Sequence, residues 1–145
     1  GRLVPVNCLT TNEMKFIKFA DLLIPKNHKV LDNNKKTVEN FLFHLAKSSL
    51  TERTIQLADK HLLHPKRISV RNQKTRWGSC SNSGTISLNW RLIQVPAFVR
   101  DYVILHELAH LKFLDHSSFF WSHLSNLCPN LHAAESWLKD YSQQV

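Results

Sequence analysis

Residues 106–110 read His-Glu-Leu-Ala-His and carry the side chains best suited to chemistry. On a helix, residues four apart lie on one face about one turn apart, so the imidazoles of His106 and His110 can reach one metal ion at ~2.0–2.1 Å. Glu107 is rotated away from that face, where it is a poor ligand but can take a proton from a water on the metal. The spacing therefore predicts a zinc-dependent hydrolase with Glu107 as its general base.

A chance occurrence of this pattern is a weak alternative. With nine histidines in 145 residues, about 0.02 His-Glu-x-x-His patterns are expected at random. The pattern also falls in an apolar stretch, where two imidazoles and a carboxylate are costly to bury without partners. Coordination of a metal satisfies these side chains. With a third imidazole and one open position, such a site favours Zn²⁺ as the cofactor.

A catalytic zinc site usually has three protein ligands and one open position. His116 follows His110 by six residues, which is the spacing of the metzincin signature. That signature has a glycine where this chain has Phe113, and Met14, the single methionine, lies upstream of the motif. Because Phe113 takes a positive φ less readily than glycine, the turn before His116 is expected to have another geometry.

Other residues near the motif allow alternatives. His116 is the predicted third ligand, and His123, on the next expected helix, competes with it for that role. Asp115 is interpreted as a local cap or as a group that orients a histidine. The residues considered for stabilising an oxyanion are Arg76, Tyr102, His123 and Tyr141.

The elements that position these residues are short strands and helices. Strands are expected at residues 3–8, 14–19 and 21–24, and residues 27–34 are expected to form a polar turn. Apolar residues at helical spacing then predict two helices, separated at Ser48-Ser49.

The second half of the chain continues this mixture. Strands are expected at residues 67–71, 75–80 and 85–89, with a hairpin turn at residues 82–84. Three helices are expected to follow Pro96, Ser117 and Pro129. The pattern predicts an α+β fold in which a small, mostly antiparallel sheet packs on several helices. Residues 1–33 are interpreted as an N-terminal short-strand region and residues 34–145 as the metal-binding domain.

Composition narrows the class of protein. A length of 145 residues with 43% hydrophobic residues is typical of a small globular domain. No apolar run approaches the ~20 residues that span a bilayer, so no membrane association is expected. Three cysteines without a CxxC pair indicate reduced thiols and a cytoplasmic location. The net charge of +8 allows a nucleic-acid or other polyanionic partner, and a solvated basic face is the alternative.

Three segments resemble the YgjP-like metallopeptidase family, which is related to the SprT-like zincins. They are residues 74–91 (KTRWGSCSNSGTISLNWR), 102–111 (YVILHELAHL) and 115–121 (DHSSFFW). The resemblance covers roughly residues 35–145, and more weakly residues 1–25. It implies a zincin-like fold, with an active-site helix beneath a small sheet.

The resemblance also implies roles for individual residues. His106, His110 and His116 would be the zinc ligands, and Glu107 the catalytic acid and base. Residues 85–89 would form the strand at the cleft, where an extended polypeptide substrate pairs with a sheet edge. The substrate-binding residues expected on this basis are Ile86, Ser87, Leu88, Asn89 and Arg76.

Three functions fit these observations. The first is a zinc metallopeptidase. The second is a zinc phosphohydrolase that acts on nucleotides, which the basic charge would attract. The third is a basic module that binds DNA or RNA and uses the metal structurally.

Overall fold

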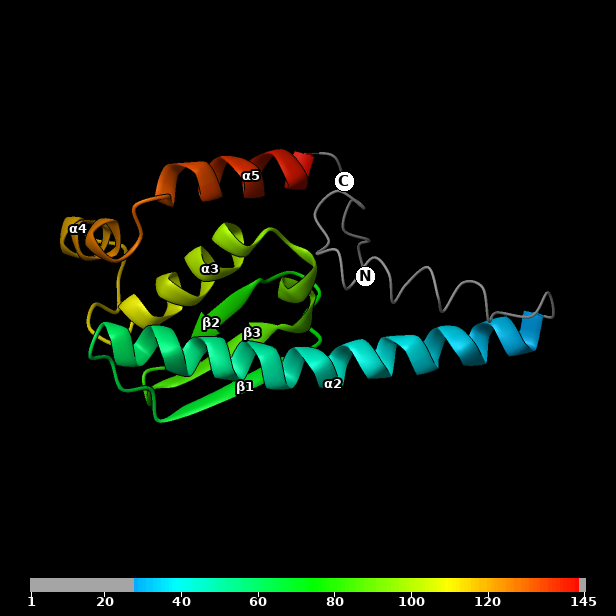
Figure 1. Ribbon diagram of the computed structural model, residues 1–145. Coiled ribbons are helices and arrows are strands. Elements are labelled where there is room, and N and C mark those ends of the chain that lie inside the picture. Colours follow the sequence, from blue (N-terminus) through cyan, green and yellow to red (C-terminus); the bar gives the residue numbers. More distant parts are fainter. Residues whose placement is uncertain (1–27, 144–145) are drawn as a thin grey trace.

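The computed structural model describes residues 28–143. In chain order, its elements are α2 (His28–Lys60), β1 (Arg67–Arg71), β2 (Gly78–Cys80), β3 (Thr85–Asn89), the 3-10 helix η2 (Trp90–Gln94), α3 (Ala97–Ala109), α4 (Ser118–Leu127) and α5 (Leu131–Gln143). Figure 1 shows α3 between the sheet and α5, with α2 running along the sheet. The expected α+β class is confirmed. The strands expected at residues 3–8, 14–19 and 21–24 lie outside the described residues.

The sheet is mixed, which corrects the expectation of a mostly antiparallel sheet. Its strand order is β1-β3-β2. β3 is antiparallel to β2 but parallel to β1, with Arg67 opposite Thr85 and Arg71 opposite Asn89. The reason is that residues 72–77 carry the chain across to the far edge before the hairpin brings β3 back into the middle.

The central position of β3 also overturns a prediction about the substrate. Both edges of β3 are already paired, to β1 and to β2. Ile86 and Leu88 are fully buried, and Ser87 and Asn89 are 8% and 5% exposed. A peptide therefore cannot add to residues 85–89, and within the described part of the chain the open edge beside α3 belongs to β2.

α2 is one helix of 33 residues where two helices were expected. Its buried face continues straight past Ser48-Ser49, because Ala46, Leu50 and Thr54 lie one turn apart and are fully buried. The Thr54 hydroxyl donates to the Leu50 carbonyl at 2.7 Å, so the helix satisfies this buried polar group itself.

The start of α2 also differs from expectation. Residues 28–34 are helical rather than a polar turn, and the helix runs across the expected boundary between residues 33 and 34. The division of the chain into these two regions stays a prediction. No helix within residues 28–143 is long and apolar enough to cross a membrane.

The turns follow the expected local chemistry. Gly84 has a φ of 91° and closes the hairpin between β2 and β3, with its N–H donating to the Ser81 carbonyl at 3.0 Å. Ser117 caps α4 as expected, since its side chain accepts from the Phe120 N–H. Asn89 caps η2 in the same way, through the Arg91 N–H at 3.1 Å.

α3 is held in place by burial and by one ion pair. Val99, Ile104 and Leu108 are fully buried. Arg53 of α2 donates to both carboxylate oxygens of Asp101, at 3.0 and 2.8 Å. Such a two-bonded pair is stronger and more directional than a single contact, so it fixes α3 against α2 near the helix start.

Candidate metal centre

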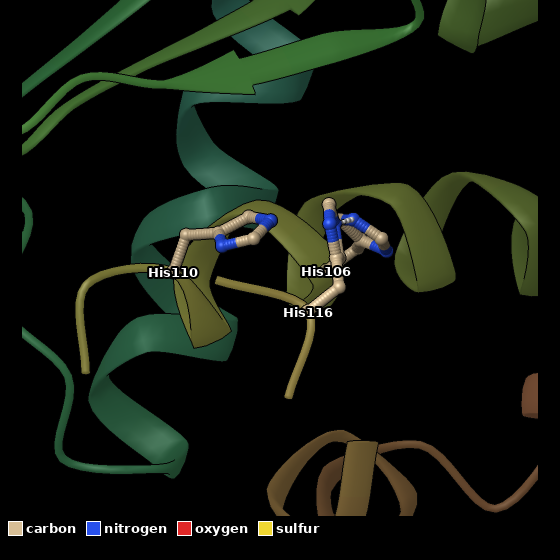
Figure 2. Close-up of side chains that lie close together, drawn as sticks. All are labelled: His106, His110 and His116. Atoms are coloured by element: carbon tan, nitrogen blue, oxygen red, sulfur yellow. Dashed lines mark hydrogen bonds between the residues drawn. The ribbon is translucent and has the colours of Figure 1, made fainter. Parts of the chain in front are cut away.

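Three histidines meet at the C-terminal end of α3. His106 lies in the helix, His110 is its C-cap residue, and His116 reaches back from the loop before α4 (Figure 2). The Nε2 atoms of His106 and His116 are 3.3 Å apart. One ring nitrogen from each of the three lies within 4.8 Å of the others. Among the described residues, the loop therefore brings His116 to the pair on the helix.

His123, the alternative partner, lies elsewhere. Its ring packs edge-on against Phe113, with centroids 5.5 Å apart. Between residues 28 and 143, Leu62 is the one non-glycine residue with a positive φ. Phe113 therefore has a negative φ. Asp115 accepts from the Ser117 N–H at 3.4 Å, which agrees with its interpretation as a local cap. The turn thus returns His116 to the cluster without the glycine of the metzincin signature.

The spacing of one pair of these nitrogens matches that of two ligands on a tetrahedral ion. Two ligands at ~2.0–2.1 Å that subtend a tetrahedral angle are about 3.3–3.4 Å apart, which matches the separation of the His106 and His116 Nε2 atoms. Burial and the neighbouring imidazoles lower the pKa of His106 to about 4. His106 is therefore neutral near pH 7, which is the state that binds a metal.

Hydrogen bonds fix the orientation of two of the rings. His110 Nδ1 lies 3.0 Å from the Phe113 carbonyl. A carbonyl only accepts, so Nδ1 carries the proton and Nε2 is left with its lone pair. Phe120, which is fully buried, stacks on the His110 ring at 4.4 Å with an interplanar angle of 21°. The ring is thus held from one edge and one face.

A second helix supports His106. The Tyr102 hydroxyl donates to Glu135 of α5 at 3.1 Å. His106 Nδ1 lies 3.3 Å from the Tyr102 hydroxyl oxygen. Because Tyr102 donates to Glu135, it accepts from His106, which again leaves Nε2 free. Tyr102 was considered as an oxyanion donor, but its proton is held by Glu135. Sequence reasoning missed Glu135, since it lies 33 residues away on another element.

Glu107 is a buried carboxylate beside the cluster. Burial raises its pKa to about 7, although the charge of Arg76 acts in the opposite direction. A general base works best with a pKa near the working pH. The carboxylate fits because Gly78 has no side chain: a β-carbon there would lie 3.0 Å from Glu107 Cγ and 3.2 Å from Oε2.

The raised pKa predicts how the stability of the metal-free protein depends on pH. The unfolded chain loses the Glu107 proton near pH 4.5, whereas the folded chain keeps it to about pH 7. Between these values the unfolded state binds fewer protons, so this group lowers the free energy of unfolding as pH rises. From pH 5 to pH 8, the loss is roughly 2–3 kcal/mol.

Urea unfolding of the metal-free protein and of Glu107→Gln, each at pH 5 and pH 8, measures this effect. The difference between the two proteins isolates Glu107, because His106 contributes with the opposite sign and equally to both. Its pKa is lowered, so its contribution is lost as pH falls toward 4. Parallel pH profiles for the two proteins would contradict the prediction.

The open edge of β2 runs past Glu107. The Asn89 N–H donates to the Trp77 carbonyl at 2.9 Å, and the Ser81 N–H donates to the Thr85 carbonyl at 3.0 Å. Backbone groups alternate in direction along a strand, so those of Gly78 and Cys80 point away from β3. Unpaired groups of this kind can bind another extended chain.

The five residues expected to bind substrate have other positions. Ile86, Ser87 and Leu88 belong to the buried strand. The Asn89 Nδ2 atom donates to the carbonyls of Gln73 at 2.9 Å and Arg76 at 3.0 Å. Asn89 thus holds the loop before β2, and the exposed Arg76 side chain alone remains accessible.

The fold and the histidine cluster define a domain of the metallopeptidase class. The crystal structure of the metallopeptidase zymogen of Pyrococcus abyssi abylysin is 24% identical and superposes with a TM-score of 0.57, covering 65% of this chain and 95% of that chain. This likeness shows a shared fold. The sequence matches the YgjP-like metallopeptidase domain over residues 2–141, and the chain belongs to that family. No curated protein matches the chain significantly in sequence.

Proposed function

We propose that this protein is a zinc-dependent peptidase in which His106, His110 and His116 hold the metal and Glu107 is the general base. The observation that supports it is the arrangement of the three imidazoles, whose nitrogens lie within 4.8 Å of one another. A buried carboxylate adjoins them on the same helix. Membership of a metallopeptidase family agrees with this chemistry.

The chain supplies proton transfer and positioning. His106, His110 and His116 would hold a zinc ion, which would supply the Lewis acidity that activates water and polarises a carbonyl. Glu107 takes the proton of the attacking water as the new C–O bond forms. Glu107 then returns this proton to the amine nitrogen as the C–N bond breaks. Burial, which raises the pKa of this carboxyl in the metal-free protein, favours a group that takes up a proton and then gives it back.

The substrate is a polypeptide that lies along the outer edge of β2. Within residues 28–143 no strand pairs with the outward-facing backbone groups of Gly78 and Cys80, so these groups can pair with the substrate's backbone without demanding a particular sequence. Gly78 also contacts Glu107, so a peptide on this edge passes close to the base. The two cysteines among the described residues are free thiols, in keeping with the cytoplasmic location that we propose.

The experiment compares two substrate classes on one zinc-loaded preparation. A peptide library is analysed by mass spectrometry for new termini, and a set of nucleotides is analysed for released phosphate. We expect peptide-bond cleavage that a chelator abolishes and added zinc restores. Phosphate release without peptide cleavage would instead support the phosphohydrolase, and inactivity on both with salt-sensitive nucleic-acid binding would support the binding module.

A further inference from the structure

A basic pocket lies at the start of β2, whose first residue, Gly78, contacts Glu107. It has a volume of about 470 Å³. Its lining contains three cationic side chains and no carboxylate: Gln73, Lys74, Thr75, Arg76, Trp77, Asn89, Arg91 and Tyr141. A concave site with charge of one sign attracts ligands of the opposite sign.

The cations of this pocket form no ion pair with an acidic group of residues 28–143. Within residues 28–143, the ion pairs join Asp101 to Arg53 and to Arg100. Lys74, Arg76 and Arg91 form none in that part of the chain. Three cations in one hollow repel one another, so the arrangement gains from binding an anion.

The walls of the pocket are already fixed by the protein itself. Asn89 holds the loop through the carbonyls of Gln73 and Arg76. The Arg91 Nη1 atom donates to the Gln73 carbonyl at 3.2 Å, and its guanidinium lies 5.0 Å from the centroid of the Trp90 ring. A preformed site loses less entropy when a ligand binds.

Gln73 does not itself select the ligand. Its Oε1 atom is buried and has no hydrogen-bond partner among the described residues, so a ligand in the pocket does not reach it. The kind of anion follows instead from the place of the pocket at the start of β2, along whose edge a peptide would lie.

The place of the pocket connects it to the reaction. Residues 73–77 directly precede β2, whose first residue, Gly78, contacts Glu107. If a peptide lies antiparallel to β2, its C-terminal part, which follows the cleaved bond, runs toward residues 73–77. At about 3.4 Å per residue, the pocket is then within a few residues of that bond.

We propose that this pocket binds a carboxylate of the peptide substrate on the C-terminal side of the cleaved bond. The inference rests on the proposed peptidase function. The carboxylate comes either from an Asp or Glu side chain or from the C-terminus of the substrate. Both have the same charge and shape, so matched peptides are needed to separate them.

Binding is measured by calorimetry with the zinc-loaded, full-length Glu107→Gln protein. The probes are alanine-rich octapeptides that carry one Glu or one Gln, each with a free or an amidated C-terminus. We expect about tenfold tighter binding for the peptide that supplies the carboxylate. A preference for Glu over Gln identifies a side chain, and a preference for the free over the amidated end identifies the C-terminus.

Two charge reversals locate the effect. Lys74→Glu changes an exposed side chain of the pocket and is expected to abolish the tenfold preference. Lys47→Glu makes the same change of charge on an exposed part of α2 and is expected to keep it. Loss of the preference in both variants would place its origin in net charge rather than in the pocket and would overturn the proposal.

The remaining outcomes separate this proposal from the proposed function. Equal binding of acidic and neutral peptides, with peptides still cleaved by the unsubstituted protein, overturns the pocket alone. A carboxylate preference that needs Lys74, without any cleavage, supports the pocket and overturns the peptidase. A thymidine octanucleotide that binds through Lys74 while the acidic peptides do not bind would replace the carboxylate with phosphate.

Discussion

Glu107→Gln is expected to lower the rate of peptide hydrolysis by about 10³-fold while zinc binding stays unchanged. Glutamine has nearly the same shape as glutamate, but its amide cannot take a proton from water. General-base catalysis contributes about 10²–10⁴-fold to a rate, so the loss is expected to fall in this range. Zinc binding should persist because Glu107 is not among the three clustered side chains.

Turnover of a peptide found by library cleavage, together with the zinc content of the same preparation, measures both parts of this prediction. Glu135→Gln is the matched control. It removes another carboxylate close to the site but keeps an oxygen that can accept from Tyr102, so its loss should be far smaller than that of Glu107→Gln. Full activity in Glu107→Gln would show that the proposed base is wrong.

Local patterns predicted the parts of the site that one short segment builds. The helix that carries His106 and His110 follows from their spacing and from the apolar residues around them. The turn at Gly84 and the cap at Ser117 also depend on the chemistry of single residues. His116 lies six residues from His110, so a short loop suffices to bring it back.

Features that depend on distant parts of the chain could not be predicted in the same way. The three strands were expected near their observed positions, but their order decides that β3 is central and β2 is the edge. No property of residues 85–89 alone distinguishes these cases, because a buried strand and a cleft strand are both apolar. The contact between Tyr102 and Glu135 joins two helices for the same reason.

Gly78 shows how a local interpretation gains meaning from the fold. In the sequence, a glycine after Trp77 is explained by a bend. In the structure, it lies in an edge strand against α3, and the missing side chain leaves room for the carboxylate of Glu107. The same absence would let an extended chain approach the strand near the proposed base, so one residue serves both the proposed catalytic group and the proposed substrate edge.

His116→Ala is expected to abolish most of the stabilisation that zinc gives to the folded protein. A ligand that binds only the folded state adds about 2.7 kcal/mol when its free concentration is 100 times its Kd. Removal of one of three ligands should raise that Kd by at least about a hundredfold, since loss of an outer partner alone costs 10–100-fold. His116 is exposed and lies in a loop, so the metal-free protein should keep its stability.

Thermal unfolding with and without zinc tests this, because each protein serves as its own metal-free reference. His123→Ala is the matched control: His123 was the alternative third ligand, and its ring packs on Phe113 instead of joining the cluster. That variant can lower the metal-free stability through lost packing, yet its zinc-dependent increase should equal that of the unsubstituted protein. If the increase survives in His116→Ala and disappears in His123→Ala, then the loop reorganises when zinc binds and the third ligand is His123.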